Sequence, residues 1–195
     1  MSDQARQRDN LATIANHPPP AAEIRHDPFA YLSYEHVIEE RLCDLLEAIA
    51  DALPDGVSPD CGKTAVDYLQ SRFPRHIALE NEIVFPMLKA ARVADLSLGR
   101  AIKQALQEHA ADEDTAAELA EALTAFMDRG KVGDANALGY MLRGFFEQRR
   151  RHIVWEEALL YPLARGNIAA ADMDGLGESI LRYLMHSNRI LQLSG

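Results

Sequence analysis

The two halves of this chain repeat each other, and the repeat constrains the fold more than any other feature of the sequence. Each half contains two helical stretches, of which the first carries one histidine and the second carries a His-x-x-x-Glu sequence. His36 and His109 hold matching places in the first stretches, and His76 and His152 hold matching places in the second. A duplicated helical hairpin is the simplest description of this pattern.

From Asp27 onward, apolar residues recur at helical spacing, and no segment shows the alternation typical of a strand. We expect helices over about 27–53, 58–91, 96–129 and 134–165, followed by a shorter one over about 173–193. The breaks between them are short, which favours antiparallel neighbours. The sequence therefore predicts an all-α, up-down four-helix bundle in a domain over residues 26–195. The short extra C-terminal helix has two open roles, covering one end of the bundle or forming a homodimer contact.

Residues 1–25 differ from the rest of the chain in composition. They are polar and contain three consecutive prolines, Pro18 to Pro20, which favour an extended segment over packing. We therefore expect a flexible, extended N-terminal tail, with a short helix over Gln4 to Ala15 as the open alternative.

Composition excludes several classes of function. The chain carries 20 Lys and Arg against 30 Asp and Glu, for a net charge of −10, which argues against a nucleic-acid binder that follows phosphates. No apolar run approaches the length of a membrane helix, and the first twenty residues lack the apolar centre of a secretory signal. Cys43 and Cys61 show no metal-pair spacing. We therefore expect a cytoplasmic protein without a membrane or nucleic-acid partner.

The repeated histidines each stand in the middle of the apolar stripe of their helix, so each is predicted to face the bundle interior. A glutamate follows two of them by four residues and therefore lies on the same face, one turn on. No Lys or Arg is expected on these stripes, and we interpret Arg149 to Arg151 as a solvated face. Six ligand-type side chains are thus predicted to converge: His36, His76, Glu80, His109, His152 and Glu156.

A single inward histidine is ordinarily a core residue that is hydrogen-bonded to a neighbour. Six such groups in a two-fold pattern favour a metal site instead, because buried carboxylates need a partner. Imidazole with carboxylate suits iron, manganese or zinc, and two carboxylates placed to bridge indicate two ions. Such a centre would be positive, and we expect it to attract small anions or diatomic molecules: hydroxide, azide, nitric oxide or reduced dioxygen.

The order His, His-x-x-x-Glu, His, His-x-x-x-Glu, with a proline six residues after each glutamate, resembles the hemerythrin-like proteins of the HHE cation-binding family over roughly residues 27 to 165. The resemblance implies a non-haem di-iron centre with bridging carboxylates and an oxo or hydroxo bridge. It implies a protein that binds or senses dioxygen, nitric oxide or redox and iron status. Its ligands would be His36, His76, Glu80, His109, His152 and Glu156.

The chain departs from oxygen-carrying hemerythrins in its third helix. Those proteins have a second histidine one turn away, whereas Ala105 and Glu113 flank His109 here. The departure implies an open metal position or a substitute ligand. An enzyme that turns over peroxide or nitric oxide is therefore the main alternative.

Three further alternatives agree less well with the residues of this chain. Iron–sulfur repair proteins of the same family carry N-terminal cysteines, which residues 1–25 lack. A metal-free structural bundle fits the intact repeat least well. Ferritin-like proteins use Glu-x-x-His, and this reading fails because the residues three places before the histidines are Ser33, Phe73, Leu106 and Arg149.

Several residues outside the predicted ligand set also carry a structural expectation. Glu40 and Glu113 each follow a histidine by four residues and are either additional ligands or solvated acids. Phe85 and Tyr161 hold the same repeat position and are most simply core aromatics. Pro74 is expected to kink its helix.

Overall fold

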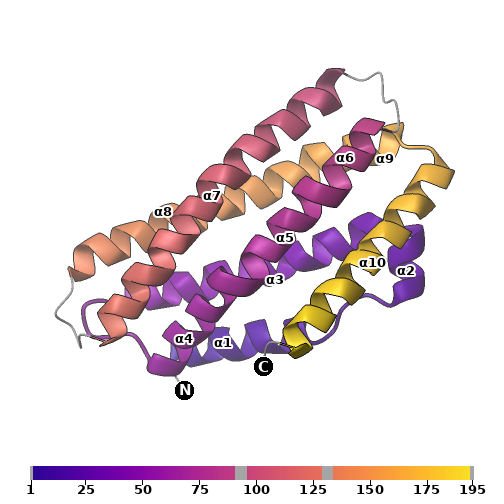
Figure 1. Cartoon of the computed structure of the whole chain (residues 1–195). Coiled ribbons are helices and arrows are strands. Elements are labelled where there is room, and N and C mark those ends of the chain that lie inside the picture. Colours follow the sequence, from indigo (N-terminus) through magenta and orange to yellow (C-terminus); the bar gives the residue numbers. More distant parts are fainter. Residues whose placement is uncertain (1, 91–95, 129–133, 194–195) are drawn as a thin grey trace.

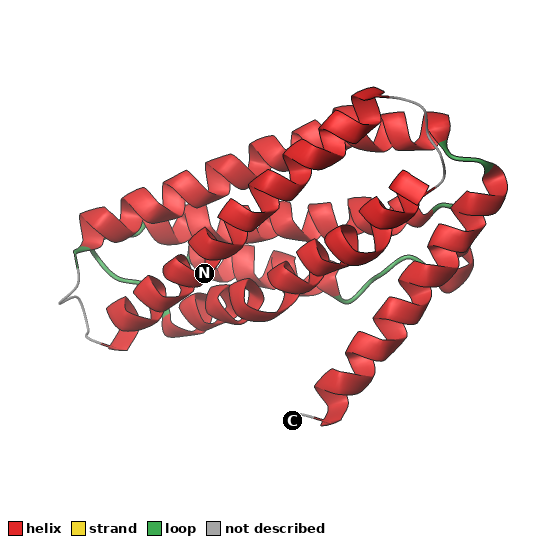
Figure 2. Cartoon of the chain, turned by 45° about the horizontal axis from the view of Figure 1, so that its top comes forward, coloured by secondary structure: helices red, strands yellow, loops and turns green. Residues whose placement is uncertain are grey.

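The computed structural model describes residues 2–90, 96–128 and 134–193, without the side chains of residues 188–193. Within these ranges every regular element is a helix and no strand occurs, as Figure 2 shows. The all-α prediction is therefore confirmed. The expected helix ends at Ala91 and Arg129 lie outside the described residues.

Four long helical rods lie side by side in the described residues (Figure 1). The first rod is α3 and the third rod is α7, whereas the second and fourth rods are each interrupted by wider π-helical turns. α3 packs against α8, and α7 packs against both α8 and α4. The bounds are α3 Pro28–Asp51; α4 Pro59–Asp67, α5 Phe73–Leu79 and α6 Phe85–Ala90; α7 Leu96–Asp128; and α8 Ala135–Trp155 with α9 Tyr161–Asn167.

Each π turn ends at an aromatic residue that is followed by proline. In the second of these turns, the N–H of Phe85 donates to the carbonyl of Glu80, five residues earlier. Proline has no N–H, and its ring crowds the carbonyl four residues before it, so a wider turn lets the helix continue. The irregularity expected at Pro74 thus takes the form of a π turn just before it. The turns are Tyr68–Arg72, Glu80–Val84 and Glu156–Leu160.

The N-terminal residues are helical, in contrast to the extended tail that we expected. α1 (Asp3–Ala15) begins at Ser2, whose hydroxyl accepts from the backbone of Ala5. Leu11 is only 3% exposed and belongs to the core, and α1 packs along α3. The short helix that we left open is therefore the one that forms, because its apolar side is buried. The division between residues 1–25 and 26–195 stays a prediction.

α10 (Ala170–Leu193) packs against α2 (Ala21–His26) and also contacts α3 (Figure 1). The two helices approach closely at Gly177, where an added Cβ would lie 2.5 Å from the Arg25 carbonyl oxygen. Arg25 and Glu178 form an ion pair at 2.6 Å on the same interface. α10 therefore adds a layer to the bundle, and a homodimer contact through it stays a prediction.

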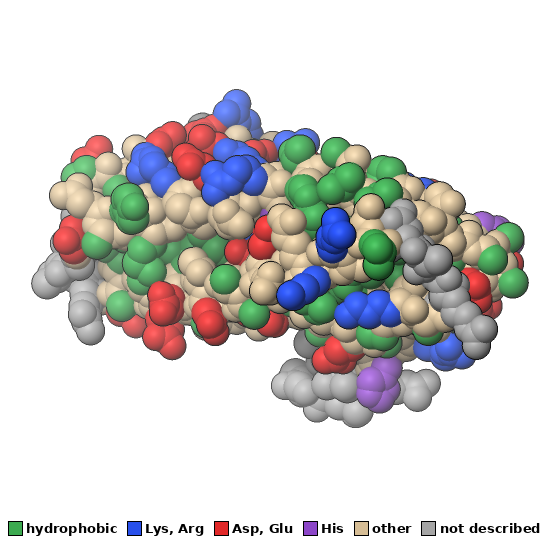
Figure 3. Space-filling view, turned by 90° about the horizontal axis from the view of Figure 1, so that it is seen from above, with side chains coloured by type: hydrophobic (Ala, Val, Ile, Leu, Met, Phe, Trp, Pro, Cys, Tyr) green, Lys and Arg blue, Asp and Glu red, His purple; other side chains and the backbone are tan. Residues whose placement is uncertain are grey.

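The core consists of two apolar clusters, and the predicted ligands lie near the boundary between them on each rod. The first apolar cluster includes Leu42, Phe73, Leu119 and Phe145, and the second includes Leu32, Phe85, Ile102 and Leu160. A buried polar layer thus lies between two apolar walls. The outer surface is mixed, since acidic and basic side chains are interspersed on the face shown in Figure 3.

Candidate metal centre

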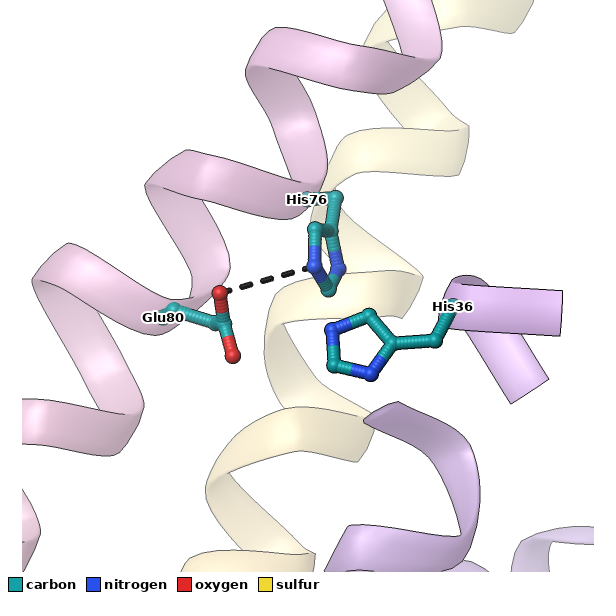
Figure 4. A group of neighbouring side chains, drawn as sticks. All are labelled: His36, His76 and Glu80. Atoms are coloured by element: carbon teal, nitrogen blue, oxygen red, sulfur yellow. Dashed lines mark ion pairs between the residues drawn. The ribbon is translucent and has the colours of Figure 1, made fainter. Parts of the chain in front are cut away.

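The structure brings all six predicted ligands into the polar layer, and each is at most 2% exposed. They form two groups, and within each group the ligand atoms lie within 4.8 Å of one another. Figure 4 shows the first group, in which the three side chains point toward one another from the first and second rods. The groups are His36 with His76 and Glu80, and His109 with His152 and Glu156.

Both glutamates stand at the first residue of a π turn, and both face the two groups at once. Glu156 Oε2 lies 3.1 Å from His36 Nε2, and its Oε1 lies 3.3 Å from His152 Nε2. Glu80 Oε2 lies 3.4 Å from Nε2 of His76 and 3.4 Å from Nε2 of His109. Each carboxylate is therefore positioned between the two groups of imidazoles.

Three of the four imidazoles are held in place from outside the centre. The Nδ1 atoms of His36, His109 and His152 lie 2.7–2.8 Å from side-chain oxygens. Such contacts fix the tautomer and the ring orientation, and they leave Nε2 facing inward. The sequence alone did not indicate these partners, although each is adjacent in sequence to a predicted ligand. They are Glu157, Asn81 and Glu108, respectively.

Tyr161 is buried, as expected of a core aromatic, but its hydroxyl also reaches the centre. The hydroxyl donates to Glu80 Oε1 at 2.6 Å and lies 3.3 Å from His36 Nε2. Its ring is parallel to the His36 ring, with centroids 5.3 Å apart. Phe85 stacks in the same way on His109 at 5.8 Å, without a hydroxyl. The two halves of the centre therefore differ chemically.

Burial dominates the electrostatics of these groups. It lowers the pKa of His76 and of His109 to about 3. Burial, together with the nearby Glu156 carboxylate, raises the pKa of Glu80 to about 8. Burial also opposes the charge of His36, but Glu156 and Glu157 outweigh it and raise the pKa of that imidazole to about 10.

Several buried atoms in the centre lack a hydrogen-bond partner: both oxygens of Glu156, Oε2 of Glu80 and both ring nitrogens of His76. Leaving a polar atom in this state costs roughly 1–3 kcal/mol. A metal ion would satisfy the inward-facing atoms. Two donors on one ion, with bonds of about 2.1 Å, lie about 3.0 Å apart at right angles and about 3.4 Å apart in a tetrahedron. The contacts of 3.1–3.4 Å described above match these values, so the residues fit metal ions.

We expected no arginine on the inward stripes and a solvated face at Arg149 to Arg151. Arg149 contradicts both expectations, because it is 1% exposed and lies inside the bundle. It pairs with Glu39 Oε2 at 2.7 Å and with Asp112 Oδ2 at 2.7 Å, and its guanidinium lies over the Phe73 ring. These two carboxylates offset the cost of burying its charge. Within the run of three arginines, Arg151 is exposed as expected.

On the first and third rods, the acids that follow His36 and His109 by four residues are not the buried ones. Glu113 is exposed and Glu40 is half-buried, and neither belongs to a candidate metal group. The buried carboxylates stand one residue earlier, at Glu39 and Asp112. Both hold the same place in the repeat, three residues after a histidine, and this matching was the signal that we missed.

A comparison with known protein families matches residues 27–164 to the hemerythrin HHE cation binding domain. The chain belongs to this family. No match was found among curated proteins or among solved structures. The HHE domain is a cation-binding domain, and the two His/Glu groups are places where this chain could hold metal ions. Among the described helices, none combines the length and hydropathy needed to cross a bilayer.

Proposed function

We propose that this hemerythrin domain holds two iron ions and uses the pair to bind or sense dioxygen, nitric oxide or the redox and iron status of the cytoplasm. The observation that carries this proposal is the arrangement of Glu80 and Glu156, which each face both groups of imidazoles. Iron is the metal that the family resemblance implies, and the donor set suits it. The proposed ligands are His36, His76, Glu80, His109, His152 and Glu156.

An iron pair would supply positive charge and redox chemistry at this point of the bundle. The protein's own residues prepare the place for it. Glu157, Asn81 and Glu108 hold three imidazoles by their Nδ1 atoms, and the two apolar clusters exclude bulk water. Tyr161 keeps its proton, because burial raises its pKa well above the usual value. Its hydroxyl therefore donates to Glu80 and fixes that carboxylate.

The second group offers a place for a small ligand. Oxygen-carrying hemerythrins have a further histidine on the third helix, but Ala105 is buried in the second apolar cluster and Glu113 is exposed. Neither residue supplies a donor, so His109 and His152 are the imidazoles of this group. We propose that the ligand binds on this side: dioxygen, nitric oxide or an anion such as azide.

The second candidate function is a di-iron oxidoreductase that turns over peroxide or nitric oxide. The Tyr161 hydroxyl favours it, because a buried donor stands 2.6 Å from Glu80 and 3.3 Å from His36 Nε2.

Anaerobic titration separates the two candidates. The reduced, iron-loaded protein receives nitric oxide, dioxygen or peroxide in successive additions of less than one equivalent each, up to a total of many equivalents, and the absorption spectrum is recorded after each addition. A sensor or carrier changes its spectrum in proportion to the ligand added and then stops. Consumption of many equivalents of nitric oxide or peroxide per iron pair would establish the enzyme instead. An iron-loaded spectrum that no ligand perturbs would contradict both.

A further inference from the structure

We propose that Glu39 supplies a further carboxylate to the metal position formed by His36, His76 and Glu80. The inference rests on the proposed metal centre, and it concerns a residue outside the repeated His and His-x-x-x-Glu motifs. It would make the two metal positions unequal in charge and in number of protein donors.

The first observation is an unpaired oxygen atom. Glu39 is 1% exposed, and its Oε1 has no hydrogen-bond partner. Its other oxygen, Oε2, is fixed by two nitrogens of Arg149 at 2.7 and 3.2 Å. Arg149 therefore holds the carboxylate in place, while Oε1 is left to a different partner. A buried carboxylate oxygen in this state is costly unless it meets a donor or a cation.

The second observation is where that oxygen lies. Glu39 Oε1 is 3.7 Å from His76 Nε2, which also has no hydrogen-bond partner. Two donors on one ion, with bonds of about 2.1 Å, lie between about 3.0 Å apart at right angles and about 4.2 Å apart when opposite. The distance between Glu39 and His76 falls inside this range, as does the 3.4 Å between Glu80 and His76. Both carboxylates can therefore share an ion with His76.

The third observation comes from the repeat. The counterpart of Glu39 is Asp112, which also pairs with Arg149 but is one methylene shorter. In the described part of the chain, Asp112 forms no ion pair with an imidazole of the second group. The longer side chain of Glu39 thus approaches an imidazole of the first group, whereas, among the described residues, the shorter side chain of Asp112 forms no such pair in the second group.

The fourth observation concerns the support of His76. Its Nδ1 has no partner, unlike the Nδ1 atoms of the other three imidazoles. Glu35 holds the repeat position that matches Glu108, but it binds Arg72 and the Tyr31 hydroxyl instead. His76 therefore lacks an outer carboxylate, and Glu39 brings a carboxylate to its inward face.

Glu39→Asp tests this inference, with Asp112→Asn as the matched control. Aspartate at position 39 keeps the charge that pairs with Arg149 and withdraws the oxygen from His76. Asp112→Asn disturbs the same arginine without touching the first metal position. We expect Glu39→Asp to bind one of two Fe(II) ions at least about 10-fold more weakly in an anaerobic chelator competition. It should also lose part of the rise in melting temperature that iron produces. Asp112→Asn should bind both ions as the wild type does.

The outcomes distinguish this inference from the proposed function. If the wild type binds two ions and Glu39→Asp binds both with unchanged affinity, Glu39 is not a ligand and the di-iron proposal stands. Equal weakening in both variants would mean that Glu39 acts only through Arg149, which also overturns the inference. If the wild type does not bind two ions, the proposed function itself fails. Should Glu39→Asp not melt cooperatively, Glu39→Gln keeps the side chain's length, removes its charge and is judged by the same criteria.

Discussion

The Tyr161 hydroxyl donates a hydrogen bond of 2.6 Å to Glu80 Oε1, so a residue of the fourth rod fixes a proposed ligand of the second rod across the centre. Glu80 and Glu156 hold equivalent places in the repeat, yet Glu80 alone receives a phenol, because Phe85 stands where a second tyrosine would be. The duplicated hairpin has therefore become asymmetric at its functional core.

This asymmetry predicts the behaviour of Tyr161→Phe. Phe85 shows that phenylalanine is accommodated at the equivalent position, so we expect the variant to fold and to hold both ions. Loss of the hydrogen bond should reduce the stability of the metal-free protein by about 1–2 kcal/mol. The iron-loaded absorption spectrum should shift, because Glu80 is no longer restrained. An unchanged spectrum together with unchanged denaturant unfolding would contradict this role, and Phe85→Leu serves as the control for ring packing alone.

Removal of the metal should destabilise the fold. Metal bound to the native state stabilises it by mass action, by about 4 kcal/mol for one site at a thousand-fold excess over Kd. We expect the melting temperature to fall when a chelator strips the ions and to recover when Fe(II) is restored under anaerobic conditions. His186 is exposed, so metal should raise the melting temperature of His186→Ala as much as that of the wild type. The rise should be smaller in His152→Ala. Identical melting curves with and without metal would rule out a buried site.

The raised pKa of Glu80 gives the metal-free protein a defined pH dependence. The pKa of this carboxyl is about 8 in the folded protein, against 4.5 for an ordinary glutamate, so its contribution to stability is fully present below pH 4.5 and is lost as the pH rises to 8. Glu80→Gln stays neutral throughout. In the absence of metal, its stability relative to the wild type should therefore increase between pH 5 and pH 8, by on the order of a few kcal/mol. A difference that stays constant over this interval would contradict the account.

Arg149 should be essential to the fold, whereas its neighbour Arg151 should not. Arg149→Met leaves Glu39 and Asp112 buried without their cation, which costs about 3–5 kcal/mol when one partner of a buried pair is removed. Arg151 is exposed, so Arg151→Met should change the free energy of unfolding by less than about 0.5 kcal/mol. Urea unfolding of both variants measures the difference. Equal changes in the free energy of unfolding would mean that the ion pairs of Arg149 with Glu39 and Asp112 do not stabilise the fold.

The helices and the inward positions of the proposed ligands could be predicted because both depend on periodicity within one helix. His76 and Glu80 share a helical face whatever the neighbouring helices do. The partners of the imidazoles could not be predicted in this way. Glu157 contacts His36 from a rod far away in sequence, and nothing within either helix specifies which acid faces which ring.

The burial of Arg149 and the packing of α1 were mispredicted for a related physical reason. A run of three arginines is ordinarily solvated, and burial of the first depends on Glu39 and Asp112, which come from two other helices. The N-terminal residues are polar on average, but Leu11 finds an apolar surface on α3. Contacts with other helices thus decided both the burial of Arg149 and the packing of α1. The matching places of Glu39 and Asp112 in the repeat were the sequence signal that pointed to the burial of Arg149.

The metal content of the purified protein tests the central claim most directly. After expression in iron-rich medium, we expect close to two iron ions per chain in the wild type and in His186→Ala. His76→Ala and His152→Ala should each retain about one, because each removes an imidazole from a different group. A wild-type protein that holds a single tightly bound ion, or none after anaerobic reconstitution with Fe(II), would contradict the account.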